Sequence, residues 1–212
     1  AVASMLAFPL GIYLGSKVNF TGNYQYGNAD IMRFFGRSAL LYGFLLPTYS
    51  GGSDPYKYYL ATAGLTMALI PAGFYGAYRL TKGRDYSSGR GFFIETAGIM
   101  GALSGLMIPQ LFNVRSFDFV GERRIMVTSI LAGHALGTVF GFKYKERNSY
   151  NFFQGVFTAV SAGCGAAIGL AVPFLAQADS SKPYIAASVL GGWAGLIAGE
   201  YLAKSLFEVS GQ

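Results

Sequence analysis

Residues 91–112, GFFIETAGIMGALSGLMIPQLF, decide the fold of this chain. The stretch is apolar apart from Glu95, is rich in glycine and alanine, and reaches a proline, Pro109, near its end. A similar glycine-to-proline ending recurs at 43–47 and 169–173, so the three prolines that close these stretches are almost evenly spaced along the chain. A fixed period with matching internal landmarks indicates an internal repeat.

Composition supports a helical protein in lipid. The chain of 212 residues has 30 glycines and is 52% hydrophobic but only 12% charged. Soluble domains carry about 25% charged residues and about 7% glycine. Small residues at this density are typical of helices that pack closely in a membrane. The single cysteine, Cys164, lies in an apolar run, where we expect a small buried side chain.

Small residues recur at a spacing of four, which favours helices over strands. We therefore predict an all-α, polytopic membrane protein of about seven glycine-rich helices, built from two-helix repeats of roughly 62–64 residues. Residues 1–29 form a half repeat in this interpretation, with a second helix and a polar connector, and we expect a processing site or a longer chain before residue 1. The remaining repeats are 30–90, 91–154 and 155–212, all within one continuous helical membrane domain.

The glycines of each repeat are predicted to form helix-packing faces. Glycine allows two backbones to approach closely, and such contacts are a main source of helix association in lipid. The predicted packing residues are Gly73, Gly98, Gly101, Gly105, Gly133, Gly137, Gly141, Gly191, Gly195 and Gly199.

Three ionisable residues fall inside the apolar segments, namely Glu95, His134 and Glu200. Ionisable groups inside a membrane are functional candidates by default. None of the three recurs at the equivalent position of another repeat. Glu200 and Lys204, four residues apart, are expected to form a weak pair along one helix face.

The sequence contains no recognisable catalytic or metal-binding pattern. One histidine and one cysteine fall short of a zinc ligand set, and no Gly-x-Ser-x-Gly element accompanies His134. We therefore expect no enzyme activity, no metal site and no cofactor. The net charge of +6 is spread over segment edges, which suits lipid headgroups and not nucleic acid.

Basic residues collect in alternate connectors, around 79–90 and 143–147. The positive-inside rule then places these connectors and the C-terminus on the cytoplasmic or matrix side of a membrane. The expected function is a non-catalytic structural or assembly subunit of a larger membrane complex, in contact with the bilayer and with other membrane subunits or further copies of itself. Two alternatives remain open: a small transporter or channel that uses Glu95 and His134, and a soluble, tightly packed helical repeat array.

Overall fold

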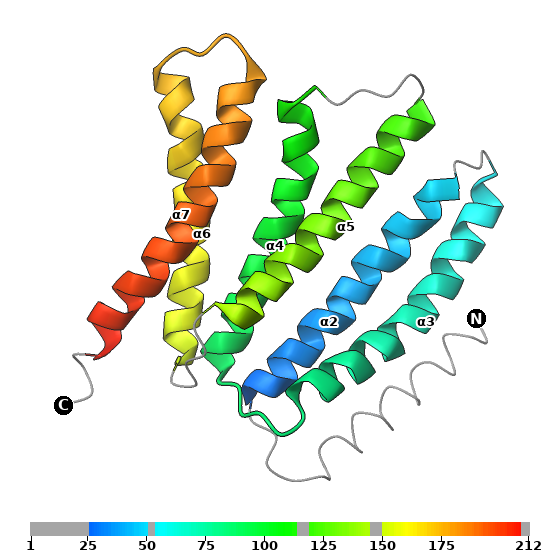
Figure 1. Cartoon of the computed structure of the whole chain (residues 1–212), viewed down its shortest axis with the longest axis horizontal. Helices are drawn as coiled ribbons and strands as arrows, with labels where there is room; N and C mark the ends of the chain where they lie inside the picture. Colours follow the sequence, from blue (N-terminus) through cyan, green and yellow to red (C-terminus); the bar gives the residue numbers. More distant parts are fainter. Residues whose placement is uncertain (1–25, 51–53, 114–118, 145–149, 209–212) are drawn as a thin grey trace. The chain divides into compact units, whose positions relative to one another are not determined.

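The computed structural model describes residues 26–50, 54–113, 119–144 and 150–208 (Figure 1). These residues form α-helices and one short 3-10 helix, and the described part of the chain contains no strand. The predicted all-α class is therefore confirmed for these residues. The elements are α2 (Tyr26–Leu45), η1 (Leu46–Ser50), α3 (Pro55–Thr81), α4 (Ser88–Leu111), α5 (Phe119–Lys143), α6 (Phe152–Leu175) and α7 (Ser181–Glu208).

Five helices, α3 to α7, are long and apolar enough to cross a membrane. This supports an integral membrane protein. The helix α2, which we expected to be a further membrane segment, is not among the five. Its 20 residues include Asp30, Arg33 and Arg37, which interrupt the apolar stretch. The predicted helix in 1–15 lies outside the described residues.

The helices pair as antiparallel hairpins within two compact units that divide between Tyr86 and Ser87. In the first unit α2 packs on α3. In the second unit the most extensive contacts join α4 to α5 and α6 to α7, and α4 also contacts both α6 and α7 (Figure 1). The second unit is therefore two hairpins held together through α4.

Two helices that begin hairpins, α4 and α6, start with the same type of cap. The Ser87 hydroxyl accepts a hydrogen bond from the Arg90 backbone N–H at 3.3 Å. The Asn151 side chain accepts one from the Gln154 backbone N–H at 2.8 Å, and the Gln154 side chain accepts one from the Asn151 N–H. Such caps satisfy N–H groups that the first helical turn leaves without partners. The two capping residues, Ser87 and Asn151, occupy equivalent positions in the predicted repeat.

The ends of the same two helices also correspond. Asn113 and Gln177, which are equivalent in the predicted repeat, have positive φ values of 50° and 51° just beyond α4 and α6. A left-handed residue is a common way to end a helix, and asparagine tolerates it better than most. The prolines Pro109 and Pro173 lie in the last turn of each helix. In the turn that follows, the Asn113 N–H donates to the Gln110 carbonyl at 3.3 Å, and the Gln177 N–H donates to the Phe174 carbonyl at 3.1 Å.

The connector after α3 is tied back to the start of α2 within the first unit. The Asn28 side chain donates to the Arg84 carbonyl and accepts from the Tyr86 backbone N–H, both at 2.9 Å. Asn28 is buried, and Gly83 turns the chain with a φ of 76°. A turn fixed by a buried amide accounts for the Asn, Asp and Gly content of this connector.

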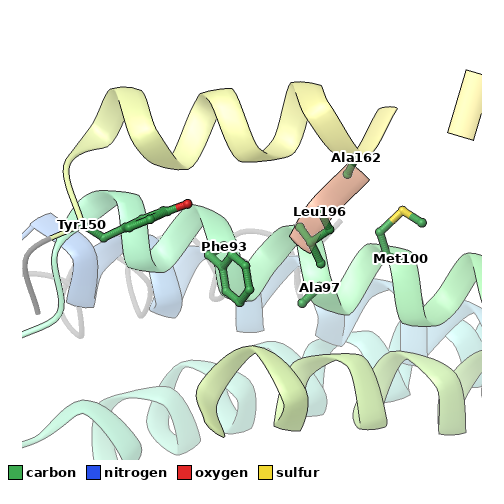
Figure 2. Packing of buried hydrophobic residues seen from close by; sticks show 6 residues of the cluster. All are labelled: Phe93, Ala97, Met100, Tyr150, Ala162 and Leu196. Atoms are coloured by element: carbon green, nitrogen blue, oxygen red, sulfur yellow. The ribbon is translucent and has the colours of Figure 1, made fainter. Parts of the chain in front are cut away.

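The core of the second unit lies along α4. Figure 2 shows Phe93, Ala97 and Met100 along this helix, with Leu196 of α7 and Ala162 of α6 opposite them. Tyr150, which precedes α6, closes the cluster at one end. Small residues such as Ala97 and Ala162 let the three helices approach each other around Phe93.

Candidate functional site

The α4/α5 crossing brings the backbones of the two helices into contact. A Cβ added at Gly101 would overlap the carbonyl oxygen of Gly133, and one at Gly137 would overlap that of Ala97. At Gly105 it would overlap the carbonyl oxygen of Ser129. No side-chain rotation relieves an overlap with a backbone atom, so these glycines set the distance between the helices.

The α6/α7 crossing repeats these contacts at equivalent positions. Gly165 meets the carbonyl of Gly191, Gly195 meets that of Ser161, and Gly169 meets that of Ala187. The contacts of α4 recur in α6 one full repeat later, and those of α5 recur in α7 after a slightly shorter interval. The two hairpins of the second unit therefore share one crossing geometry.

The α2/α3 hairpin has the same crossing with larger side chains. A Cβ at Gly73 would lie 2.9 Å from the Phe35 carbonyl oxygen, and one at Gly43 would lie 3.0 Å from the Thr66 Cα. Ala39 stands where the other hairpins have Gly101 and Gly165. The positions of Gly73, Gly137 and Gly195 correspond in the three hairpins.

The remaining predicted packing glycines lie near the same crossings. A Cβ at Gly141 would lie 2.9 Å from the Ile94 Cα, so this glycine continues the α5 face towards the start of α4. At Gly199 it would lie 2.8 Å from the Ser161 hydroxyl oxygen. Gly98 is buried in α4.

Glu95 and His134 lie on neighbouring helices but at different depths. Ile94 is level with Gly141, whereas the residue before His134, Gly133, is level with Gly101 and Gly105. Seven residues of α5 separate His134 from Gly141, which is about 10 Å along the helix. His134 is buried and Glu95 is half-buried, and the structure does not bring them together as a direct pair.

Glu200 is buried and forms an ion pair with Lys204 on the next turn of α7. The side chains of Glu200 and Lys204 are only 6% and 17% exposed. We expected a weak pair on a helix face, and the structure instead encloses it. The two charges are therefore withdrawn from water, where the loss of either partner has a large cost.

Arg90 and a group of aromatic rings fill the same end of the second unit. The Arg90 guanidinium is buried, lies 5.5 Å from the Phe93 ring centroid and donates to the Phe142 carbonyl at 3.0 Å. Tyr144 stacks on Phe93 with ring centroids 5.5 Å apart, and Tyr150 contacts the Phe93 ring edge-on. A cation over an aromatic face is attracted by the ring quadrupole.

Tyr150 connects this aromatic group to the ion pair of α7. Its hydroxyl hydrogen-bonds to Thr158, which is fully buried in α6. The pKa of Tyr150 is raised to about 12, chiefly by burial. The Thr158 hydrogen bond and the positive charge of Arg90 lower this pKa, and the negative charge of Glu200 raises it. Arg90, Phe93, Tyr150, Thr158 and Glu200 thus form one buried group, here called the polar–aromatic cluster, in which α4, α6 and α7 meet.

Tyr150 is expected to titrate late in the folded protein. Its native pKa lies above the ordinary value of 10.0, so the unfolded state releases this proton first as the pH rises. Tyr150 therefore causes no pH-dependent change in the free energy of unfolding below about pH 10. Its contribution lowers this free energy as the pH rises from about 10 to 12. The near-ultraviolet absorbance of tyrosinate in wild type and in Tyr150→Phe measures the step.

The control for this titration is wild-type protein unfolded in denaturant, in which the late step disappears. Identical folded-state titration curves for wild type and Tyr150→Phe above pH 10 would contradict the assignment.

Further polar contacts join α4 to α7 in the middle of the second unit. The Trp193 indole N–H donates to the Ser104 hydroxyl at 2.9 Å, and the Ser104 hydroxyl donates to the Met100 carbonyl at 2.8 Å. The Ser188 hydroxyl lies 3.8 Å from the Met107 sulfur. The Trp193 ring also packs edge-on against Phe140 of α5, with centroids 5.3 Å apart.

The described residues contain no group of three or more His, Cys, Asp or Glu side chains that could hold a metal ion. No known protein-family model, curated protein or solved structure matches this chain.

Sequence reasoning did not single out Arg90 and Tyr150 as members of a buried cluster. A usable signal was the tyrosine that recurs at equivalent positions of two repeats, as Tyr86 and Tyr150. Both are buried in the structure. Arg90 was counted only as a connector charge, because no sequence pattern shows that Phe93 and Phe142 enclose it.

Proposed function

We propose that this chain is a non-catalytic structural or assembly subunit of a larger membrane protein complex. The observation that carries the proposal is the use of its glycines. They hold α4 against α5 and α6 against α7 at backbone contact, so the two helices of each hairpin are closely packed along the crossing. Closely packed hairpins are suited to holding neighbouring subunits in place.

The outward surfaces of these helices are strongly apolar and support a location in lipid or against other subunits. Leu136 of α5, Ile168 of α6 and Leu190 of α7 are each about two-thirds exposed or more, at 71%, 66% and 69%. The exposed cysteine Cys164 lies on α6 as well, which corrects our expectation of a buried thiol. Such surfaces are suited to hydrocarbon, because an α-helix satisfies its backbone hydrogen bonds internally and these exposed side chains are apolar.

We also propose that the hairpins are copies of one repeat unit. The caps at Ser87 and Asn151, the left-handed residues Asn113 and Gln177, and the equivalent glycine crossings support this. All of these features recur with the spacings found in the sequence. Successive copies would then have the same orientation in the membrane.

The proposed sidedness rests on charge. The starts of α4 and α6 lie together, because a Cβ at Gly155 would lie 2.7 Å from Gly89. Arg90, Lys143 and Lys204 belong to this end of the second unit. The positive-inside rule favours this end for the cytoplasmic or matrix side.

Gentle detergent extraction of the native protein, followed by sizing and mass spectrometry of what accompanies it, tests the proposed function. We expect stable particles in which this chain is held with other subunits. Mild salt washes should leave the particles intact, because their contacts are apolar.

A lone chain that carries ions or solutes across vesicles, with flux lost in Glu95→Gln or His134→Ala, would overturn the proposal in favour of a transporter or channel. Release from membranes into buffer without detergent would overturn every membrane assignment.

A further inference from the structure

The α4 helix receives the α6/α7 hairpin through one continuous face. Phe92 packs edge-on against Phe152, and the Met100 side chain fills the space beside Gly192. Ser104 accepts the hydrogen bond from Trp193, and Met107 lies against Ser188. This face is an established interface between two hairpins of the second unit.

Within the described residues of the second unit, the equivalent face on α6 has no hairpin against it. When α6 is aligned on α4 by matching their crossing glycines, Gly89, Phe92, Met100, Ser104 and Met107 correspond to the residues here called the α6 face, which are Phe153, Val156, Cys164, Ile168 and Ala171. Three of the five α4 residues are buried and none is exposed, whereas four of the α6 residues are exposed. Phe153 and Ile168 are 68% and 66% exposed.

We propose that the α6 face binds the α2/α3 hairpin of a second copy of this chain. The inference rests on the proposed function and names the partner of the assembly. The proposed contact repeats the α4 interface one repeat further along the chain. In it, α6 corresponds to α4, and α3 of the second copy corresponds to α7. Because α4 and α6 start at the same end of the unit, the second copy has the same orientation in the membrane.

The side chains at the corresponding positions are complementary in size. The crossings place Gly73 in register with Gly195, and Thr66 in register with Ser188. Gly192 therefore corresponds to Ile70, and Met100 to Cys164. A large residue on α4 against glycine becomes a small residue on α6 against isoleucine.

The polar contact between α4 and α7 is replaced by an apolar one in this register. Ser104 and Trp193 correspond to Ile168 and Pro71, which have no hydrogen-bonding side chains. Ile70 and Pro71 are partly exposed. Neither the α6 face nor these two positions includes a charge, as a contact within hydrocarbon requires.

The proposed contact uses different surfaces on the two copies. Such heterologous contacts continue from copy to copy and produce a ring or an open array, not a twofold dimer. The single native cysteine distinguishes the two cases, because a twofold contact of α6 with α6 would bring two Cys164 thiols together.

The test is disulfide cross-linking of the full chain in its membrane, with a cysteine placed at residue 70. Oxidation of Ile70→Cys should link residue 70 of one copy to Cys164 of another, giving dimers and longer ladders. The same bands should be lost in Ile70→Cys combined with Cys164→Ser. Tyr75→Cys is the matched control. Tyr75 is 64% exposed on α3, and its counterpart on α7, Ile197, is itself exposed and not buried against α4.

Cross-links in wild type through Cys164 alone, or equal yields for Ile70→Cys and Tyr75→Cys, would overturn the inference. The extraction experiment separates this from the failure of the proposed function. Particles that contain other proteins but only one copy of this chain would overturn the contact between two copies, and the proposed role as a subunit of a complex would be retained. A monomer without partners would overturn both.

Discussion

Substitution of Gly165 by valine is expected to destabilise the α6/α7 hairpin by about 3 kcal/mol, the upper part of the range for overpacking. A Cβ at this position overlaps the carbonyl oxygen of Gly191, and the two added methyl groups increase the overlap. The neighbour is backbone, so only a separation of the two helices relieves it. The midpoint of denaturant-induced unfolding in detergent measures the loss.

Gly163→Val in the same helix is the matched control. A Cβ at Gly163 meets nothing within 4 Å, so we expect a change within about 0.5 kcal/mol, as for surface substitutions in general. Both variants exchange glycine for valine in α6, and their difference therefore isolates the close crossing. Equal losses for the two would show that helix propensity or membrane insertion, and not packing, controls stability.

Gly101→Val extends the test to the α4/α5 hairpin. Gly101 corresponds to Gly165 and faces the carbonyl of Gly133 in the same manner. We expect a loss of comparable size. A loss confined to one hairpin would contradict the shared crossing geometry.

Replacement of Glu200 by alanine is expected to cost about 3 kcal/mol, because removal of one partner of a buried ion pair leaves the other charge uncompensated. Lys204 is 17% exposed and thus less enclosed than Glu200, so we expect a cost at the lower end of the range for such pairs. Glu200 is also a member of the polar–aromatic cluster, in which its negative charge raises the pKa of Tyr150. Denaturant-induced unfolding measures the effect.

Two comparisons separate the ion pair from the space that its side chains fill. Glu200→Met combined with Lys204→Met removes both charges and is expected to recover most of the stability lost in Glu200→Ala. Lys57→Met breaks an exposed pair with Asp54 and should change stability little, since exposed pairs contribute little. A double variant less stable than Glu200→Ala would show that the charges themselves stabilise the fold.

Much of the architecture follows from the sequence because it depends on local patterns. The repeat period, the apolar runs and the four-residue spacing of small side chains predict helices and membrane spans directly. The first helix predicted in residues 30–90 is present as α2, but three charges keep it out of the five helices that are apolar enough to cross a membrane. The prediction was wrong at Cys164, because an apolar neighbourhood in a membrane protein does not imply burial within the protein.

The positions of the candidate ionisable residues required the folded chain. Glu95 and His134 both lie in apolar helices, and the sequence allows them to meet. The α4/α5 crossing separates their levels by about 10 Å of helix. The relative levels of Glu95 and His134 depend on which glycines meet across the crossing. This register depends on both helices and cannot be read from either segment alone.

The sequence by itself determined that this chain is helical, rich in packing glycines and apolar enough to cross a membrane, because hydropathy and residue spacing act within single segments. Only the tertiary structure decided which backbones touch, that Arg90, Tyr150 and Glu200 share one buried cluster, and that the α6 face is exposed while its α4 equivalent is covered. The physical reason is that burial is set by neighbours that are distant in the chain. Two copies of one pattern can therefore have opposite environments.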